Sequence, residues 1–447
     1  MQRYLPSGFG YKYLSSPFQS ATVNEFADDV DLAATFPTFY AYDEDNHRDS
    51  AGISIYSSGW VKYITAANPL VPVSGYAANM GANAAAKTIN ATGIVNSGNL
   101  TRTLYNHNRV YTKGFNLAGN PYPSPINWNA ASGWTKTNID NALYYFDAST
   151  TDQYTGTYST YINGISSNGI ANGIIPSMQG FFVHVSNGSY PVTATLAMDN
   201  RVRINNLAPA FHKSETAQDQ PLVRLSAAYE NKNVIDPVVV YFDANASQGF
   251  DQMLDALKLM NTDLNVPNLY TVTPQTDFLS ISALPLPADS ITRVPLGIKT
   301  EKAGWVILNA TNLDNIPSGL NVYLADDATG RVLNLQQIPT YRVNISPGSL
   351  NNRFALLFSE KEITGIINEG NVFYANIENG KLKVYVNLPS VNESRLTIHN
   401  VLGQVMLQQD LYGNGQHEID TRLTGGIYIL SLQSTQGINS IKIYIPK

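Results

Sequence analysis

The clearest alternation of hydrophobic and polar residues lies at the C-terminal end of the chain. One face of its first segment carries Leu382, Val384, Val386 and Leu388, and the other carries Lys381, Lys383, Tyr385 and Asn387. The same period of two returns at 396–399, 427–430 and 441–445, with Gly- and Asn-rich turns between the segments. This period is typical of antiparallel strands that have one packed face and one wet face. The sequence therefore predicts a small antiparallel β-sandwich over 361–447.

A second set of apolar segments fills 221–360. They occupy 222–229, 238–242, 269–272, 278–281, 292–298, 304–310, 321–325, 340–345 and 353–358. Short strands at this spacing, separated by Asp, Gly and Pro turns, predict a β-sandwich of immunoglobulin-like or jelly-roll-like architecture. A single helical period predicts one short helix that crosses between the sheets. Its residues are Phe250, Met253, Leu254, Leu257 and Met260.

Residues 1–205 read as a Gly-, Asn- and Tyr-rich β domain, which a polar, patternless linker at 206–220 joins to the sandwich. The strand predicted at 180–185 is apolar on both faces, so we expect it to be central. The Ala-rich segment 77–91 predicts either a helix or an irregular edge. Three prolines follow Gly119 within six residues, so the segment 120–123 is interpreted as a rigid turn or, alternatively, as a binding loop.

Composition narrows the function classes. The length of 447 residues predicts about three domains, and the whole chain reads as a multi-domain all-β protein. The net charge is −6 and basic residues do not cluster, which argues against nucleic-acid binding. The chain has no cysteine, which excludes disulfides and thiolate chemistry. We expect no transmembrane helix, because no apolar run approaches the roughly 20 residues that one needs. Residues 1–8 do not resemble a signal peptide, so we expect a removed signal or a longer parent protein.

An acidic loop is the main candidate for a metal site. Asp43, Asp45 and Asp49 lie close together, and calcium prefers several carboxylate oxygens from one loop. The alternative is a solvated acidic turn, and no other cofactor is predicted. The six histidines lack metal-ligand spacing, and His184 is predicted to be a core or edge residue because it lies in an apolar strand.

Aromatic residues are the main candidates for a ligand site. An aromatic platform on which sugar rings stack would use side chains that are apolar at one end and polar at the other. Its predicted members are Trp60, Trp128, Trp134, Tyr144 and Tyr145. Tyr122, in the proline-rich segment, is a further candidate. The alternative is that these rings are core or cross-strand partners in the sheets.

Two stretches resemble a known family. The segment 396–404, the pair Gly425-Gly426 followed by Tyr428, and 441–443 resemble the C-terminal sorting domains of the type IX (Por) secretion system of Bacteroidetes. The segment 114–128, GFNLAGNPYPSPINW, resembles the "GWNLVGNPYPS"-type segment of surface proteins from the same phylum. The positions that carry the sorting resemblance are Asn400, Gly403, Gln404, Gly425, Gly426, Tyr428 and Lys442.

The resemblance implies export to the outer surface of a Gram-negative cell and contact with outer-membrane secretion machinery through 361–447. It also implies that the terminal domain is an address that is often removed afterwards. The leading hypothesis is a non-enzymatic surface protein of the adhesion or structural type, exported or capped through its C-terminal domain, whose partner is a cell-surface glycan or protein. The first alternative is a carbohydrate-binding module or accessory part of a glycan-degrading protein. The second is a hydrolase with an unrecognised site in the first domain.

Overall fold

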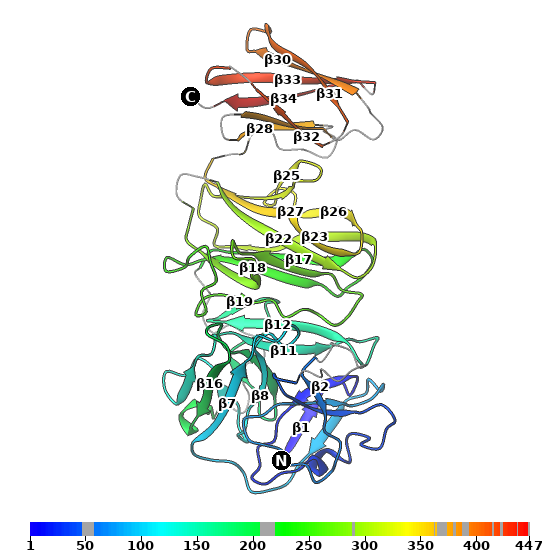
Figure 1. The fold of residues 1–447 in the computed structure, drawn as a ribbon, viewed down its shortest axis with the longest axis vertical. Coiled ribbons are helices and arrows are strands. Elements are labelled where there is room, and N and C mark those ends of the chain that lie inside the picture. Colours follow the sequence, from blue (N-terminus) through cyan, green and yellow to red (C-terminus); the bar gives the residue numbers. More distant parts are fainter. Residues whose placement is uncertain are drawn as a thin grey trace.

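The computed structural model describes residues 1–46, 58–205, 220–287, 291–361, 363, 373–378, 381–386, 393–413, 415–420, 423–435 and 437–445. These residues form an almost purely β structure, which confirms the predicted fold class. The described part contains no α-helix and two short 3₁₀ helices, η1 (Val23–Phe26) and η2 (Asn200–Val202). Figure 1 shows the chain as a stack, with the N-terminal unit at one end and the C-terminal module at the other.

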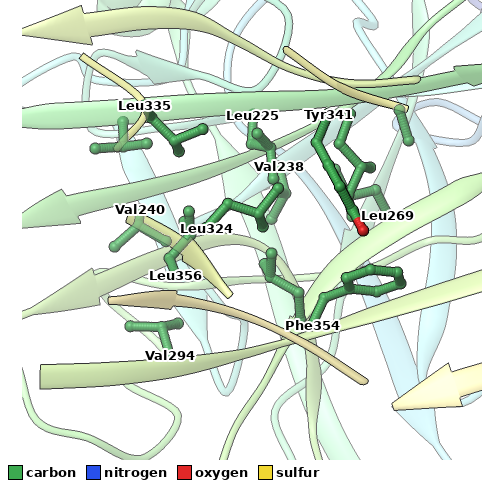
Figure 2. Packing of buried hydrophobic residues seen from close by; sticks show 14 of the residues in the cluster. Leu225, Val238, Val240, Leu269, Val294, Leu324, Leu335, Tyr341, Phe354 and Leu356 are labelled. Carbon is green, nitrogen blue, oxygen red and sulfur yellow. The ribbon is translucent and has the colours of Figure 1, made fainter. Parts of the chain in front are cut away.

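The middle of the stack is the predicted sandwich. Its strands are β17 (Leu222–Tyr229), β18 (Asp236–Phe242), β19 (Ala256–Leu257), β20 (Asn268–Val272), β21 (Phe278–Leu284), β22 (Thr292–Thr300), β23 (Gly304–Asp314), β24 (Asn321–Asp326), β25 (Arg331–Asn334), β26 (Thr340–Ile345) and β27 (Gly348–Ser359). They are ordered β25-β24-β27-β22-β20-β21-β18-β17-β23-β26, with β19 paired to β21. This long sheet folds over one apolar core, in which Leu225, Val240 and Leu356 are fully buried (Figure 2). Immunoglobulin-like connectivity stays a prediction.

The helix predicted from Phe250 to Met260 is wrong. Asp251 accepts a hydrogen bond from the Ser247 amide, and the Asp255 carboxylate accepts hydrogen bonds from the amides of Asp251 and Ala283. Aspartate side chains that bond nearby backbone compete with helix hydrogen bonds. The segment therefore makes one turn and then pairs as β19 with β21.

In its described residues the N-terminal unit has sixteen strands. They are β1 (Gln2–Leu5), β2 (Tyr11–Leu14), β3 (Phe39–Tyr42), β4 (Trp60–Lys62), β5 (Tyr76–Asn79), β6 (Lys87–Asn90), β7 (Leu100–Asn106), β8 (Phe115–Gly119), β9 (Ile126–Asn127), β10 (Trp134–Thr137), β11 (Leu143–Ala148), β12 (Gly156–Ile162), β13 (Ile165–Ser166), β14 (Ile174–Ile175), β15 (Gly180–His184) and β16 (Val192–Met198). Three sheets organise it, in the orders β13-β12-β11-β15-β8, β10-β16-β7 and β2-β5-β3-β4. Strand β15 lies between β11 and β8, so its predicted central position is confirmed. The segment 77–91 forms no helix and instead runs from β5 through a loop into β6.

The N-terminal unit and the sandwich share a hydrophobic core. The side chains of strand β18 point alternately to its two faces. Val240 belongs to the core of the sandwich. Val239 and Tyr241 belong to the shared core, together with Tyr144 and Phe182 of the N-terminal unit. A strand with two buried faces explains why 238–242 is apolar throughout. The domain boundaries predicted at 205 and 221 stay predictions.

The C-terminal module is a small antiparallel sandwich, as predicted. Its strands are β28 (Phe373–Glu378), β29 (Lys381–Val386), β30 (Glu393–Asn400), β31 (Val405–Tyr412), β32 (Gly415–Ile419), β33 (Gly426–Ser434) and β34 (Gly437–Ile445). They form two sheets, β28-β29-β32 and β31-β30-β33-β34. Leu382, Val384 and Val386 are buried in the core between the sheets, which confirms the alternation read from the sequence. None of the helices in the described ranges is long and apolar enough to cross a bilayer.

Candidate functional site

An aromatic sheet face lies in the N-terminal unit. In the sheet β2-β5-β3-β4, Tyr13 pairs with Ala77, Ala77 pairs with Tyr40, and Tyr42 pairs with Trp60. Directly paired residues point to the same side of a sheet, so these rings share one face. Tyr11, two residues before Tyr13, joins them. We call Tyr11, Tyr13, Tyr40, Tyr42 and Trp60 the aromatic face.

The other side of the same sheet carries a separate core. Leu14, Phe39, Tyr76 and Ala78 are buried there, each adjacent in sequence to a residue that faces the opposite way. The sequence shows this alternation at Tyr11-Lys12-Tyr13 and Tyr40-Ala41-Tyr42, and it is the signal that could have revealed the face. The prediction from sequence found Trp60 alone of these five residues.

A pocket of about 390 Å³ opens over the aromatic face. Tyr11, Tyr13, Tyr40 and Trp60 form its floor, together with Ala77. Its volume falls in the roughly 300–1,000 Å³ range of small-molecule sites, which are mostly apolar and aromatic with a few polar groups. The pocket is therefore the candidate functional site.

A second sheet and the sandwich supply the walls of the pocket. Phe146 of β11 and Tyr158 of β12 are cross-strand partners. The ring of Phe146 stacks on that of Tyr13 with centroids 4.8 Å apart, and the hydroxyls of Tyr13 and Tyr158 are 3.0 Å apart. The backbone of Tyr158 donates a hydrogen bond to the side chain of Asn261, next to the lining residue Thr262. The sandwich thus completes a site that the N-terminal unit begins.

The described part of the lining is uncharged. The described residues around the pocket include aromatic side chains, Ser58, Ala77 and Thr262, and no carboxylate, imidazole, amine or guanidinium. Burial raises the pKa of the Tyr158 phenol to about 12 and raises the pKa values of Tyr11 and Tyr40 above the ordinary value. The phenols therefore remain neutral near pH 7 and offer hydroxyl groups that can donate and accept hydrogen bonds.

Two of the predicted platform residues and the further candidate Tyr122 lie in the core instead. Trp128, Tyr122 and Tyr144 have no exposed surface, so they cannot stack on a sugar, and the platform interpretation is wrong for them. Core packing, the alternative drawn from the sequence, accounts for all three. The Trp128 indole donates to the Asn141 carbonyl at 2.9 Å, which satisfies its polar group inside the core.

Trp134 is half-buried at the edge of the same core. Its ring lies 4.9 Å from that of Trp128, and its indole N–H donates to the Asn127 carbonyl at 2.8 Å. The ammonium group of Lys136 lies 4.0 Å from the centroid of the Trp128 ring, where a cation–π contact is favourable. Trp134 does not line the pocket, so the structure brings it together with Trp128 and not with Trp60.

The proline-rich segment is a rigid turn, the first of its two interpretations. The buried Asn120 side chain donates to the carbonyls of Ser124, Ile175 and Pro176 at 2.9–3.1 Å and accepts from the Tyr122 amide. The Tyr122 hydroxyl donates to the carbonyls of Gly98 and Met198. These bonds join four separate stretches of the unit, which explains the residue types of the segment structurally.

The centre of the acidic loop is Glu44, a buried residue that was not among the three predicted calcium ligands. Glu44 accepts from the His107 ring at 2.7 Å and from the Thr112 hydroxyl at 3.2 Å, and Asp45 accepts from the Arg109 side chain at 2.7 Å. Asp43 accepts from the Asp45 amide, as in an acidic turn. Asp49 lies outside the described residues. Across the described ranges no group of three His, Asp or Glu is placed to hold a metal ion, and calcium binding stays a prediction.

His184 is a satisfied core histidine, as predicted. Its ring nitrogen lies 2.5 Å from the Asp140 carboxylate, whose other oxygen accepts from the Ser186 hydroxyl at 2.6 Å. His184 ends β15, and none of the three residues lines the pocket. The pair is therefore a structural hydrogen-bond network.

The sorting positions build a turn and a strand pair in the C-terminal module. The Asn400 side chain accepts from the amides of Leu402 and Gln404, and Gly403 adopts a φ of 79°, which a glycine reaches without strain. Asn400 pairs with Tyr428 across β30 and β33. The residues of the two quoted segments thus meet in space, in a turn that β33 supports.

The remaining sorting positions surround the same strand. Gly425 precedes β33, and Gly426 pairs with Ile445 at its start. The buried Tyr428 donates its hydroxyl hydrogen to the Thr424 carbonyl at 2.9 Å. Lys442 is exposed on β34. Sorting activity at these individual residues stays a prediction.

Comparisons with known proteins divide the chain between the sandwich and the C-terminal module, which lie one above the other in Figure 1. Residues 373–446 match the family described as the secretion system C-terminal sorting domain, so the chain is a type IX–sorted Bacteroidetes protein exported to the cell surface or the extracellular space. Residues 3–358 match as one continuous unit, consistent with the shared core. The sequence matches none of the curated proteins. Because its first family model covers most of its length, the chain belongs to the family described as Domain of unknown function (DUF8693), here followed by a secretion system C-terminal sorting domain.

Proposed function

We propose that this exported chain is a non-enzymatic surface protein of the adhesion type, and that the pocket on the aromatic face is where it binds its partner. The observation that carries the proposal is the lining: aromatic rings and hydroxyl groups converge on about 390 Å³ of space, and none of the described lining residues is charged. Such a surface provides contact area and hydrogen bonds, which are what binding requires.

The same lining favours binding over hydrolysis. A hydrolase needs a nucleophile or water activated by a base, or a pair of carboxylates that flank the scissile bond. The described lining offers phenols, Ser58 and Thr262, and burial raises the pKa of the Tyr158 phenol to about 12. The lining therefore supports the adhesion proposal over the hydrolase hypothesis.

The shared core between the N-terminal unit and the sandwich suits an adhesive role. Arg224 of β17 donates to the carbonyls of Ser166 and Ser167 and to the side chain of Asn312. The bonds to Ser166 and Ser167, together with the core shared by Tyr241 and Tyr144, fasten the two parts to each other.

Adhesion can be tested with fluorescent beads that carry the purified full chain. We expect such beads to be retained on mucin-coated plates or on bacterial cells, and Trp60→Ala to reduce retention. Trp305→Ala is the matched control, because Trp305 is an exposed tryptophan on β23 outside the pocket. Beads that are retained no better than uncoated beads would refute the adhesion proposal, and equal retention of both variants would refute the role of the pocket.

A panel of nitrophenyl esters and nitrophenyl glycosides tests the proposal that the protein has no hydrolase activity. We expect no turnover above that of buffer. Turnover by the full chain that Trp60→Ala removes and Trp305→Ala retains would show that the pocket is an active site.

A further inference from the structure

We propose that the pocket on the aromatic face is a subsite for a neutral saccharide, held by stacking on Trp60 and by hydrogen bonds to the surrounding hydroxyls. This inference rests on the proposed function and gives its partner a chemical class. It is supported by exposed aromatic rings at the pocket, by hydroxyl groups beside them, and by the lack of charged side chains among the described lining residues.

The exposed rings gather at the mouth of the pocket. Phe36 is 57% exposed and Tyr154 is 50% exposed, and their rings meet edge to face with centroids 5.3 Å apart. Two large aromatic side chains side by side in water leave apolar area uncovered, and such patches mark binding sites. A sugar ring presents C–H groups on one face, which cover aromatic surface in the way that another aromatic edge does.

Trp60 is set at an angle to its neighbours and does not lie flat against them. Its ring meets that of Tyr42 at 81°, with centroids 5.0 Å apart, and that of Tyr13 at 49°. In such pairs the edge of one ring meets the face of the other. Part of the Trp60 side chain is nevertheless open, because it lines the pocket. Trp60 is half-buried, unlike the fully buried Trp128.

The polar groups of the pocket match a polyhydroxylated ligand. Tyr11, Tyr40 and Ser58 bring hydroxyls that can both donate and accept hydrogen bonds. The hydroxyl of Thr262 already donates to the Gly156 carbonyl and accepts from the Gly156 amide, so it positions the wall of the pocket. Sugar hydroxyls have the same double character, so either partner can adapt to the other. The Tyr11 and Tyr40 hydroxyls come from strands β2 and β3 of one sheet, and the Ser58 hydroxyl comes from the segment before β4.

The absence of charged side chains from the described lining narrows the chemical class of the ligand. An acidic ligand such as a sialylated or sulfated glycan needs a cation, and the described lining contains no Lys, Arg or His. A quaternary ammonium group binds aromatic cages through cation–π attraction. The hydroxyl groups around this pocket add hydrogen-bonding capacity that a trimethylammonium group cannot use, which favours the saccharide.

The inference is tested by binding the full chain to an array of neutral and acidic oligosaccharides, followed by affinity electrophoresis in gels that contain the neutral polysaccharides that score. We expect at least one neutral saccharide to bind and no acidic glycan to bind more strongly. Trp60→Ala should weaken binding by at least about tenfold, the equivalent of roughly 1.4 kcal/mol. Trp305→Ala should leave it unchanged.

Two further variants separate recognition from folding. Tyr154→Ala changes an exposed rim residue, so it should weaken binding while circular dichroism and the thermal midpoint stay those of the wild type. Tyr40→Phe keeps the ring and removes one hydroxyl, so its loss should be smaller than that of Trp60→Ala. If all of these variants bind the saccharide as the wild type does, the pocket is not the subsite and the inference fails.

The remaining outcomes separate this inference from the adhesion proposal. If the beads adhere but no neutral saccharide binds, or if choline or acidic glycans alone bind, adhesion stands and the saccharide inference is overturned. If the beads do not adhere and no saccharide binds, both are overturned. Saccharide binding that depends on Trp60, without bead adhesion, supports the subsite and removes the adhesive role.

Discussion

Replacing Asn120 should destabilise the N-terminal unit far more than replacing any surface asparagine. The side chain is fully buried and makes four hydrogen bonds, three to carbonyls and one from the Tyr122 amide. Its amide group has two hydrogens for three carbonyls, so one hydrogen is shared. Asn120→Ala would leave buried carbonyls without a donor and one amide without an acceptor.

The cost follows from these orphaned groups. A buried polar group without a partner costs about 1–3 kcal/mol, and a normal hydrogen bond contributes about 1 kcal/mol net. Allowing for relaxation and for the shared hydrogen, we expect Asn120→Ala to lower the free energy of unfolding by about 3–4 kcal/mol. Asn120→Asp has the same shape but turns an oxygen toward the three carbonyls, so its loss at pH 7 should be larger still.

Urea-induced unfolding followed by tryptophan fluorescence measures the effect, because the buried Trp128 belongs to the same core as Tyr122. Asn83→Ala is the control. Asn83 is exposed and accepts one hydrogen bond from the Ala85 amide, so its replacement should cost no more than about 0.5 kcal/mol. Equal midpoint shifts for Asn120→Ala and Asn83→Ala would refute the claim that the Asn120 network holds the unit together.

Three further predictions concern the sandwich, and urea unfolding at fixed or varied pH checks each. Lys258→Met should cost about 3–5 kcal/mol, because it leaves the buried Asp236 carboxylate, now 2.6 Å from the ammonium group, unpaired; full stability in the variant would contradict this. Gly297→Ala should cost about 1–3 kcal/mol, since the new Cβ would lie 2.0 Å from the ring of its cross-strand partner, whereas Gly304→Ala, with 3.7 Å of clearance, should be nearly neutral. Burial raises the pKa of Asp255 to about 7 from 3.8, so the unfolded chain releases this proton at lower pH than the folded chain. The free energy of unfolding should therefore fall as pH rises from about 4 to about 7, by up to ~4 kcal/mol, and Asp255→Asn should flatten that slope.

Local patterns in the sequence determined most of the strands. The residues of β17 (Leu222–Tyr229) and β26 (Thr340–Ile345) agree with the predicted segments at both ends. The terminal module was predicted from alternation alone, because a sheet with one buried face imposes a period of two on each strand. The export address was also readable, since the turn residues near Asn400 and before Tyr428 are close in sequence to the strands that they join.

The tertiary structure decided where the functional surface lies. Trp60 and Trp128 are the same residue type in similar Gly- and Asn-rich surroundings, yet one lines the pocket and the other is buried. Strand order and register make the difference, because they place Tyr13, Tyr40 and Trp60 on one face although these residues are far apart in the chain. Thr262 joins them from the sandwich only because the two units share a core. Pairing and packing of this kind depend on the complementarity of distant surfaces, which the local pattern around any one residue does not contain.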